Sequence, residues 1–201
     1  MTTRPYNVVR FDFWIDPAFD RILSIEPSIA LQTCAIDSPD TMLGSALASA
    51  HVLQTNSARD ELPPQLFANA ALLARCPNLL AVSANGSGCD TIDIEACTQA
   101  GVMVLNQAGG NADSVAEMAL GLMLAVLRRI AESDRLLRGR ERGFSREDLM
   151  GRELRGRTLG LVGMSEIGRR TAALGKKHRH SFVVASPRVV SKAMVFEVWR
   201  E

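Results

Sequence analysis

The amino-acid sequence predicts an α/β fold with a largely parallel sheet. Short apolar and β-branched runs alternate along the chain with segments of helical periodicity, which is the pattern of β-α-β units. The composition is 47% hydrophobic and 22% charged, which is typical of a globular chain and not of a disordered one. Its 201 residues are enough for one domain, or two small ones, with a buried core.

In the first half of the chain, strands and helices follow one another in turn. Asp16 and Pro17 mark the first helix start, because an aspartate caps a helix and a proline suits its first turn. The predicted strands are Val8–Trp14, Ile29–Ile36, His51–Gln54, Leu79–Ala84 and Val102–Asn106. The predicted helices follow Asp16 and cover Thr41–Ala50, Pro64–Arg75 and Ile92–Ala100.

The strongest helical periodicity follows the pair Gly109-Gly110. Apolar residues recur there every three or four positions, at Val115, Met118, Leu122, Val126 and Ile130. Ser114 and Glu117 have the spacing of a capping box at the helix start. The glycine pair is a candidate hinge, so the sequence predicts two domains, residues 1–108 and 109–201.

Beyond this helix, the chain is first charged and then returns to strand and helix patterns. The charges between Arg128 and Arg157 are mixed in sign, which favours a solvated surface over a nucleic-acid patch. A strand is predicted at Arg157–Met164, a helix ending near Lys177, and a strand at Ser181–Ala185.

Charge and hydropathy exclude several classes of protein. The formal net charge is +1, so no long-range attraction to nucleic acid or to an acidic membrane is expected. No apolar run reaches the roughly 18 residues that span a bilayer, and the N-terminus has no signal-peptide pattern. Four cysteines without metal-site or disulfide-framework spacing favour reduced thiols and a cytoplasmic location.

Gly163, Ser165 and Gly168 lie in a G-x-G-x-x-G frame whose middle position is serine. The frame follows a predicted strand and opens a helix, with Glu166 and Ile167 between the last two positions. This is the context in which a Rossmann-type domain binds the pyrophosphate of a dinucleotide at a helix N-terminus. A plain strand-turn-helix remains the alternative, and the serine could either donate a hydrogen bond to the phosphates or crowd them.

Dinucleotide sites usually place an acid about 20 residues further on, to bind the ribose hydroxyl. This chain has no acidic residue between Glu166 and Glu197; Ser186 lies near the expected position and Arg188 follows it. That pair suits the 2′-phosphate of NADP better than the free hydroxyl of NAD, and a solvated basic turn is the alternative.

Taken together, these residues resemble the D-isomer-specific 2-hydroxyacid dehydrogenases from Pro77 to Lys176. The run Asn85-Gly86-Ser87-Gly88-Cys89-Asp90-Thr91-Ile92-Asp93 is similar to the family's Gly-x-Gly-x-Asp-x-Ile-Asp loop. The stretch from Gly109 to Glu117 is similar to its interdomain helix start, and Gly151–Gly160 to the approach to its nucleotide strand. Order and spacing agree over about half of the chain.

The resemblance implies a fold and a set of binding residues. The fold would be a flavodoxin-like substrate domain followed by a Rossmann-type, doubly wound nucleotide-binding domain. Gly86, Ser87, Gly88 and Asn111 would bind the 2-keto or 2-hydroxy acid substrate, and successive glycines would expose backbone N–H groups to its carboxylate. The cofactor, NAD or NADP, would be bound by Ser114, Gly163, Ser165, Glu166, Ile167, Gly168, Ser186 and Arg188.

The family's catalytic arginine, carboxylate and histidine follow the nucleotide loop, where they serve hydride transfer between substrate and nicotinamide. From Gly160 to Glu201 there is room for only about one β-α-β unit, so an incomplete Rossmann-type domain in a truncated, inactive chain is expected, with no catalytic residue assigned. A non-catalytic binding or regulatory module derived from a dehydrogenase is the alternative. The family pairs into homodimers through the nucleotide domain, which implies the Ser114–Arg138 helix as an association surface. Packing of its apolar stripe into the core of the protein is the alternative.

No metal site is expected. His178 and His180 flank Arg179 in a basic turn with no second ligand cluster nearby, and His51 is interpreted as a structural residue.

Overall fold

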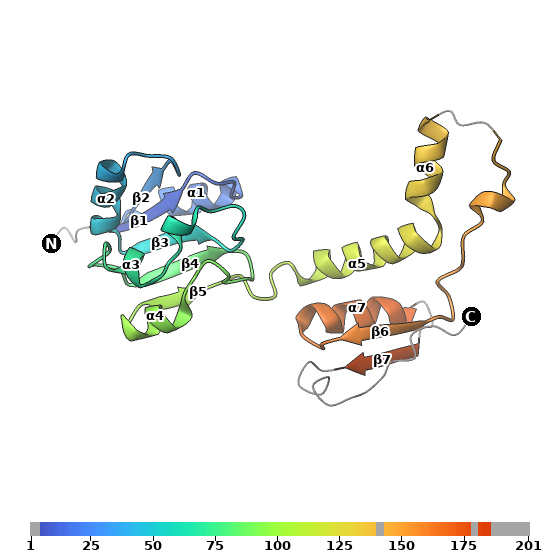
Figure 1. The fold of residues 1–201 in the computed structure, drawn as a ribbon. Helices are drawn as coiled ribbons and strands as arrows, with labels where there is room; N and C mark the ends of the chain where they lie inside the picture. The colour runs from blue at the N-terminus through green and yellow to red at the C-terminus, as the bar shows by residue number, and fades with distance from the viewer. Residues whose placement is uncertain (1–4, 140–142, 178–180, 186–201) are drawn as a thin grey trace. The chain divides into compact units, whose positions relative to one another are not determined.

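The computed structural model describes residues 5–139, 143–177 and 181–185. The chain separates into two compact units, Met1–Gly110 and Asn111–Glu201 (Figure 1). Each unit is α/β with parallel strands, as the sequence predicts. Within the described residues, no helix is both long enough and apolar enough to cross a membrane.

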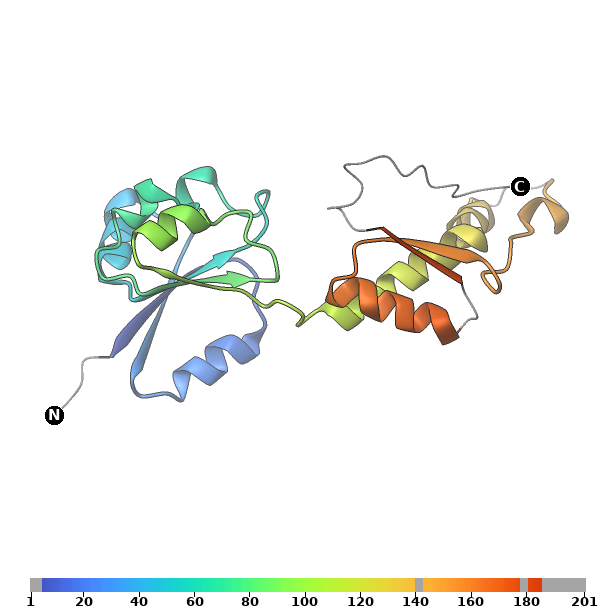
Figure 2. The same ribbon diagram turned by 90° about the horizontal axis from the view of Figure 1, so that it is seen from below.

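The first unit is built on a five-stranded parallel sheet in the order β2-β1-β3-β4-β5. Its strands are β1 Tyr6–Phe11, β2 Ile29–Cys34, β3 Val52–Asn56, β4 Ala81–Asn85 and β5 Met103–Leu105. The helices are α1 Pro17–Ser24, α2 Asp40–Ser49, α3 Ala70–Leu73 and α4 Ile94–Gln99. Figure 2 shows α1 on one face of the sheet and α2, α3 and α4 on the other.

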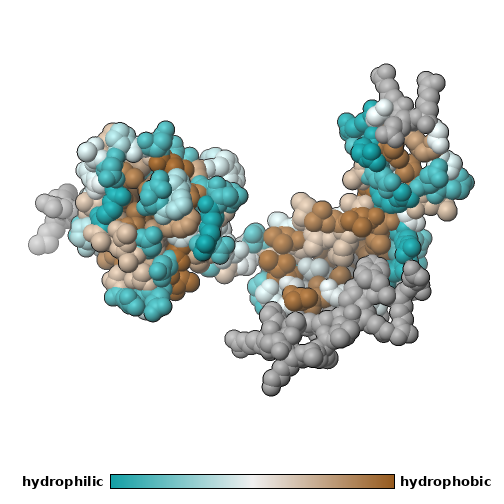
Figure 3. Space-filling view, viewed as in Figure 1, coloured by the Kyte–Doolittle hydropathy of each residue, from teal (hydrophilic) through white to brown (hydrophobic). Residues whose placement is uncertain are grey.

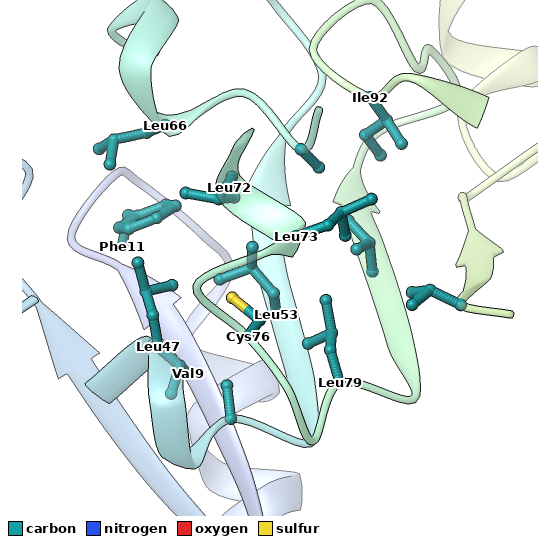
Figure 4. Close-up of a cluster of buried hydrophobic side chains, with 14 of the residues drawn as sticks. Val9, Phe11, Leu47, Leu53, Leu66, Leu72, Leu73, Cys76, Leu79 and Ile92 are labelled. Atoms are coloured by element: carbon teal, nitrogen blue, oxygen red, sulfur yellow. The ribbon is translucent and has the colours of Figure 1, made fainter. Parts of the chain in front are cut away.

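Alternation along the strands selects the face that forms the core. Val9, Leu53 and Val82 are fully buried and pack against the side of α2, α3 and α4. Leu47 from α2 and Leu72 from α3 close this layer (Figure 4). On the opposite face, the Arg10 guanidinium pairs with Asp20 of α1 at 2.9 Å.

Side chains that the sequence makes recognisable cap the helices of this unit. The Asp16 carboxylate accepts the N–H of Ala18 at 2.8 Å, and Pro17 opens α1, as predicted. Asn69 accepts two N–H groups at the start of α3, and Asp93 accepts the N–H of Ala96 at the start of α4. Each cap satisfies a donor that the first helical turn leaves without a partner.

The helix predicted over Pro64–Arg75 is wrong as a single element. A 3-10 turn covers Pro64–Leu66, the chain then extends, and α3 begins only at Ala70. Ala68 is the reason: its N–H donates to the Thr91 carbonyl and its own carbonyl accepts the N–H of Asp93, both at 2.9 Å. These contacts with a distant segment outweigh the local helical preference.

The second unit contains α5 Ala112–Leu127, α6 Ile130–Arg138 and α7 Glu166–Lys177, with β6 Thr158–Val162 pairing in parallel with β7 Ser181–Ala185. A 3-10 turn, η2, covers Glu147–Leu149. Helices α5 and α7 pack against each other, on one side of the strand pair (Figure 2).

The helix predicted to run from Ser114 to Arg138 is interrupted. Arg129 has a φ of 54°, the left-handed conformation, and separates α5 from α6. Its guanidinium donates to both carboxylate oxygens of Glu132, at 2.6 and 2.7 Å, and to the Asp148 carbonyl. A left-handed non-glycine residue is unfavourable on its own, so these contacts help to hold the bend.

All four cysteines are free thiols. Cys34, Cys76 and Cys97 are buried, and Cys89 is half-buried. Burial raises the pKa of Cys76 to about 11, so at neutral pH this thiol stays protonated.

Replacing Leu53 by alanine is expected to destabilise the first unit by about 2 to 5 kcal/mol, because Leu53 is completely buried between β1, β4 and the helices. Leu80→Ala is the matched control, since Leu80 is 54% exposed and its loss should change stability by well under half as much. Urea unfolding followed by circular dichroism measures both variants. Equal losses would show that the core is not centred on β3.

Candidate functional site

The loop Asn85–Asp93 lies at the carboxyl end of β4, where parallel α/β sheets commonly bind ligands. β3 ends beside it at Asn56, and β5 ends beside it at Leu105. The residues that follow these two strands, Ser57 and Asn106, therefore flank the loop. The sheet therefore places two other chain segments beside this short stretch of backbone.

The carbonyl groups of this loop are held by hydrogen bonds. Ser57 Oγ donates to the Asn85 carbonyl at 3.0 Å, and the Gln107 N–H donates to the Gly86 carbonyl at 2.8 Å. Asn106 Nδ2 donates to the Ser87 carbonyl at 2.9 Å. Because residues that follow β3 and β5 donate to its carbonyl groups, the loop is held in one backbone conformation.

The N–H groups of the same loop have no such partners. Among the described residues, no acceptor bonds the backbone N–H of Gly86, Ser87 or Gly88. Ser87 and Gly88 are exposed, and Gly86 is half-buried. Consecutive backbone N–H groups without acceptors are donors that can bind an anion such as a carboxylate.

Gly86 is required at its position for two reasons. Its φ is +127°, which residues with a side chain rarely adopt. A Cβ there would also lie 2.8 Å from Ser57 Oγ. The backbone of the loop can approach β3 this closely only because the residue is glycine.

Three residues at this loop were missed by the sequence reasoning. Ser57 and Asn106 hold its carbonyls, and Arg59 Nε donates to the Asp90 carbonyl at 3.0 Å. The signal that could have found them is their position, because all three lie at or shortly after the carboxyl end of a predicted strand that pairs with β4. Polar residues at such positions commonly belong to a site.

Asn111 and Ser114 lie at the start of α5, in the second unit. Asn111 is the N-cap residue and makes no side-chain capping bond, and both side chains are exposed. The capping box predicted from Ser114 and Glu117 is wrong, because α5 begins at Ala112 and Ser114 is already inside its first turn. The spacing of a capping box at Ser114 and Glu117 thus begins one turn after the actual N-cap residue, Asn111.

The glycine frame forms the turn from β6 into α7. Gly163 has a φ of +95°, and a Cβ on Gly168 would lie 2.5 Å from the Gly163 carbonyl. Two of the three frame positions therefore need glycine, one for the turn and one for close contact between turn and helix. Ser165 provides the carbonyl that accepts the first helical bond, from the Arg169 N–H at 2.9 Å.

The backbone of these residues has the features that bind the phosphates of a dinucleotide. The tight turn and the start of a helix supply N–H groups and the positive end of the helix dipole. Ile167 is half-buried between the last two frame positions, and Ser165 and Glu166 are exposed. The exposed Glu166 carboxylate adds a negative charge at the same place.

Ion pairs organise the charges around this turn. Arg169 pairs with Glu166 within the first turn of α7. Arg170 reaches Asp113 of α5 at 2.5 Å, which ties the helix that follows the glycine frame to the helix start that carries Asn111 and Ser114. The structure thus places Ser114 and the glycine frame, the cofactor-site candidates, in one unit together with Asn111. Gly86, Ser87 and Gly88 belong to the other unit.

Some predicted site residues lie outside the described residues. Ser186 and Arg188, the candidates for the cofactor's ribose, are among them, as are His178 and His180. His51 accepts the N–H of Asn7 at its Nδ1, 3.1 Å away, and its ring meets that of Tyr6 edge-on. No group of three or more histidine, cysteine or acidic side chains that could hold a metal occurs among the described residues.

Comparison with known proteins identifies the family. The model of the D-isomer specific 2-hydroxyacid dehydrogenase catalytic domain matches residues 21–197. The D-3-phosphoglycerate dehydrogenase of Archaeoglobus fulgidus is 41% identical over 104 residues, covering 52% of this chain and 19% of its own length. The glyoxylate reductase of Aeropyrum pernix is 39% identical over 110 residues, covering 52% of this chain and 33% of its own.

The chain is also similar in fold to a solved structure. A protein from Thermus thermophilus, TT0316, superposes with a TM-score of 0.73 at 25% identity, over 90% of this chain and 56% of that one. The chain therefore spans a third or less of those two relatives and about half of the solved protein. Because the family model covers most of its residues, this chain belongs to the D-isomer specific 2-hydroxyacid dehydrogenases.

Proposed function

We propose that this chain forms the substrate-carboxylate and cofactor-phosphate sites of an NAD(P)-dependent D-2-hydroxyacid dehydrogenase. The free N–H groups of Gly86, Ser87 and Gly88 are the observation that carries the proposal. They provide donors for the carboxylate of a small 2-keto or 2-hydroxy acid, and this loop carries no acidic side chain until Asp90. Asn111 is the fourth substrate residue that the family resemblance supports.

The cofactor site is proposed at the turn from β6 into α7. Gly163, Ser165 and Gly168 would approach the pyrophosphate with their backbone, together with Glu166 and Ile167 at the start of the helix. Ser114 is proposed to contact the cofactor from α5. The nicotinamide ring, when bound, would supply or accept the hydride of the reaction.

In this proposal the residues of the chain bind the substrate acid and orient it. Ser57 and Asn106 fix the loop carbonyls, so the N–H groups keep one direction before the acid arrives. Such preorganisation lowers the cost of binding. The family's acid/base chemistry needs an arginine, a carboxylate and a histidine that we assign to no residue of this chain, so we propose that the 201-residue chain binds without turnover. A non-catalytic binding or regulatory module is the alternative function.

Gly86→Ala is expected to weaken the binding of glyoxylate, or of its analogue oxalate, at least tenfold. The methyl group would collide with Ser57 Oγ and force the loop out of its backbone conformation. Isothermal titration calorimetry measures the affinity, and assays of 2-keto acid reduction with NADH and NADPH test turnover by the same protein.

Gly101→Ala is the matched control for this variant. Gly101 also has a positive φ, +70°, but nothing lies within 4 Å of its Cβ position and it is not at the loop. It should lose stability and retain binding. Equal binding by the Gly86 and Gly101 variants would reject the carboxylate site, and steady turnover by the wild-type chain would reject the proposal of binding without catalysis.

NADP is the cofactor we propose over NAD, because of the sequence beyond the described residues. No acid lies between Glu166 and Glu197 to bind a free ribose hydroxyl, and Ser186 and Arg188 would suit a 2′-phosphate. NADPH is expected to bind more tightly than NADH in a fluorescence titration, and Arg188→Ala to remove the difference. A preference for NADH that persists in the variant would reject this choice.

Homodimer formation through the second unit is also proposed. Figure 3 shows a hydrophobic stripe along α5, where Met118, Leu122 and Val126 are exposed by 58% or more. Such a stripe on a soluble protein often marks an association surface. Its alternative role is to pack against another part of a longer protein.

Leu122→Glu is expected to convert a dimer to a monomer, because the stripe would then bury a charge. Leu80→Glu, on an exposed residue of the first unit, is the control. Analytical ultracentrifugation measures both variants and the wild-type chain. A monomeric wild-type chain would reject the proposal.

A further inference from the structure

Two charged side chains at the start of α7, Glu166 and Arg169, pair with each other beside the glycine frame. Glu166 is the first residue of the helix, and Arg169 lies one turn further on. The Arg169 guanidinium donates through one nitrogen to the Glu166 carboxylate and through the other to the Met164 carbonyl, the latter at 3.1 Å. One cation thus bridges the turn and the acid.

Other charges near this turn are already engaged. Arg170, the next residue, is paired with Asp113 of α5. Glu166 and Arg169 are the two charged side chains within the first turn of α7, where an incoming anion would bind. Both are about half exposed, at 52% and 58%, so each can respond to a ligand that arrives from solvent.

An acid at this position has two opposite effects. It stabilises the helix, because a negative charge favours the positive end of the helix dipole. It also repels a pyrophosphate that would bind to the same N–H groups. The arginine cancels this repulsion only while the pair is formed.

We propose that the Glu166–Arg169 pair determines the affinity of the glycine frame for the phosphates of the dinucleotide. Glu166 weakens binding of the pyrophosphate, and Arg169 restores it by neutralising the carboxylate. The proposal rests on the cofactor site proposed above and assigns these two residues a role in setting the affinity for the cofactor's phosphates. The backbone of Gly163 and Gly168 provides the site, and the pair sets its charge.

Charge counting predicts a specific order of affinities. The wild-type pair is neutral, Glu166→Gln leaves one positive charge, and Arg169→Ala leaves one negative charge. Glu166→Gln should bind NADPH and NADH about fivefold more tightly, and Arg169→Ala about fivefold more weakly, at low salt. The double variant is neutral again and should bind like the wild-type chain.

The order of these affinities distinguishes charge from structural damage. A variant that merely disturbs the turn weakens binding, and two such changes together weaken it further, whereas neutralisation predicts recovery in the double variant. Raising the salt concentration should bring all four affinities together, because screening removes the effect of exposed charges. Melting temperatures recorded alongside show whether each variant is folded.

The experiment is a fluorescence titration of the full chain with NADPH and NADH, repeated calorimetrically with inorganic pyrophosphate. Asp134→Asn is the matched control: it removes one acid from the Asp134–Arg138 pair of α6 and changes the net charge as Glu166→Gln does. It should leave all affinities within about twofold of the wild-type values, because Asp134 lies on α6 and not on the helix that follows the glycine frame. An equal gain in this control would show that only the net charge of the protein matters, and would overturn the proposal.

The outcomes separate this inference from the proposed cofactor site. If the wild-type chain binds and neither single variant changes the affinity, the pair has no role, although the cofactor site stands. If the wild-type chain fails to bind and Glu166→Gln binds, the carboxylate is the obstacle, and the role of Arg169 in neutralising it is rejected. If neither binds any probe, both the site and the inference are rejected.

Discussion

The parallel pairing of β3 with β4 is the constraint on which the first unit depends. Asn56 lies opposite Asn85 in this register, so the residues that follow, Ser57 and Gly86, leave the sheet side by side. A shift of one residue would turn Leu53 out of the core and separate Ser57 from the loop Asn85–Asp93. The buried face of the sheet and the geometry of the candidate site are thus consequences of one register.

Much of this fold could be predicted from sequence, because strand and helix periodicities differ and the core residues follow them. Every predicted strand is present, with ends displaced by a few residues. The errors have physical causes: Ala68 bonds to Thr91 and Asp93, far away in sequence, and Arg129 bends a helix through contacts with Glu132 and Asp148. Local patterns do not contain such interactions.

The candidate site was predictable where glycine determines the backbone and not where side chains support it. Gly86, Gly163 and Gly168 lie where positive φ or close contact excludes a side chain. Ser57 and Asn106 could be placed near the ends of predicted strands, but the hydrogen bonds that they make to the loop depend on strand register, which a single sequence does not reveal. The Glu166–Arg169 pair has helical spacing, but its contact with the Met164 carbonyl is visible only in the structure.

The strand order also bears on how the first unit can form during synthesis. In the sheet β2-β1-β3-β4-β5, each strand after the first pairs with one that the ribosome has already made. β2 and β3 join β1, β4 joins β3, and β5 joins β4. Because every strand after β1 finds an earlier partner, the sheet can grow by addition as the chain emerges. The loop Asn85–Asp93 then acquires its support from the segment after β3 first and from the segment after β5 last.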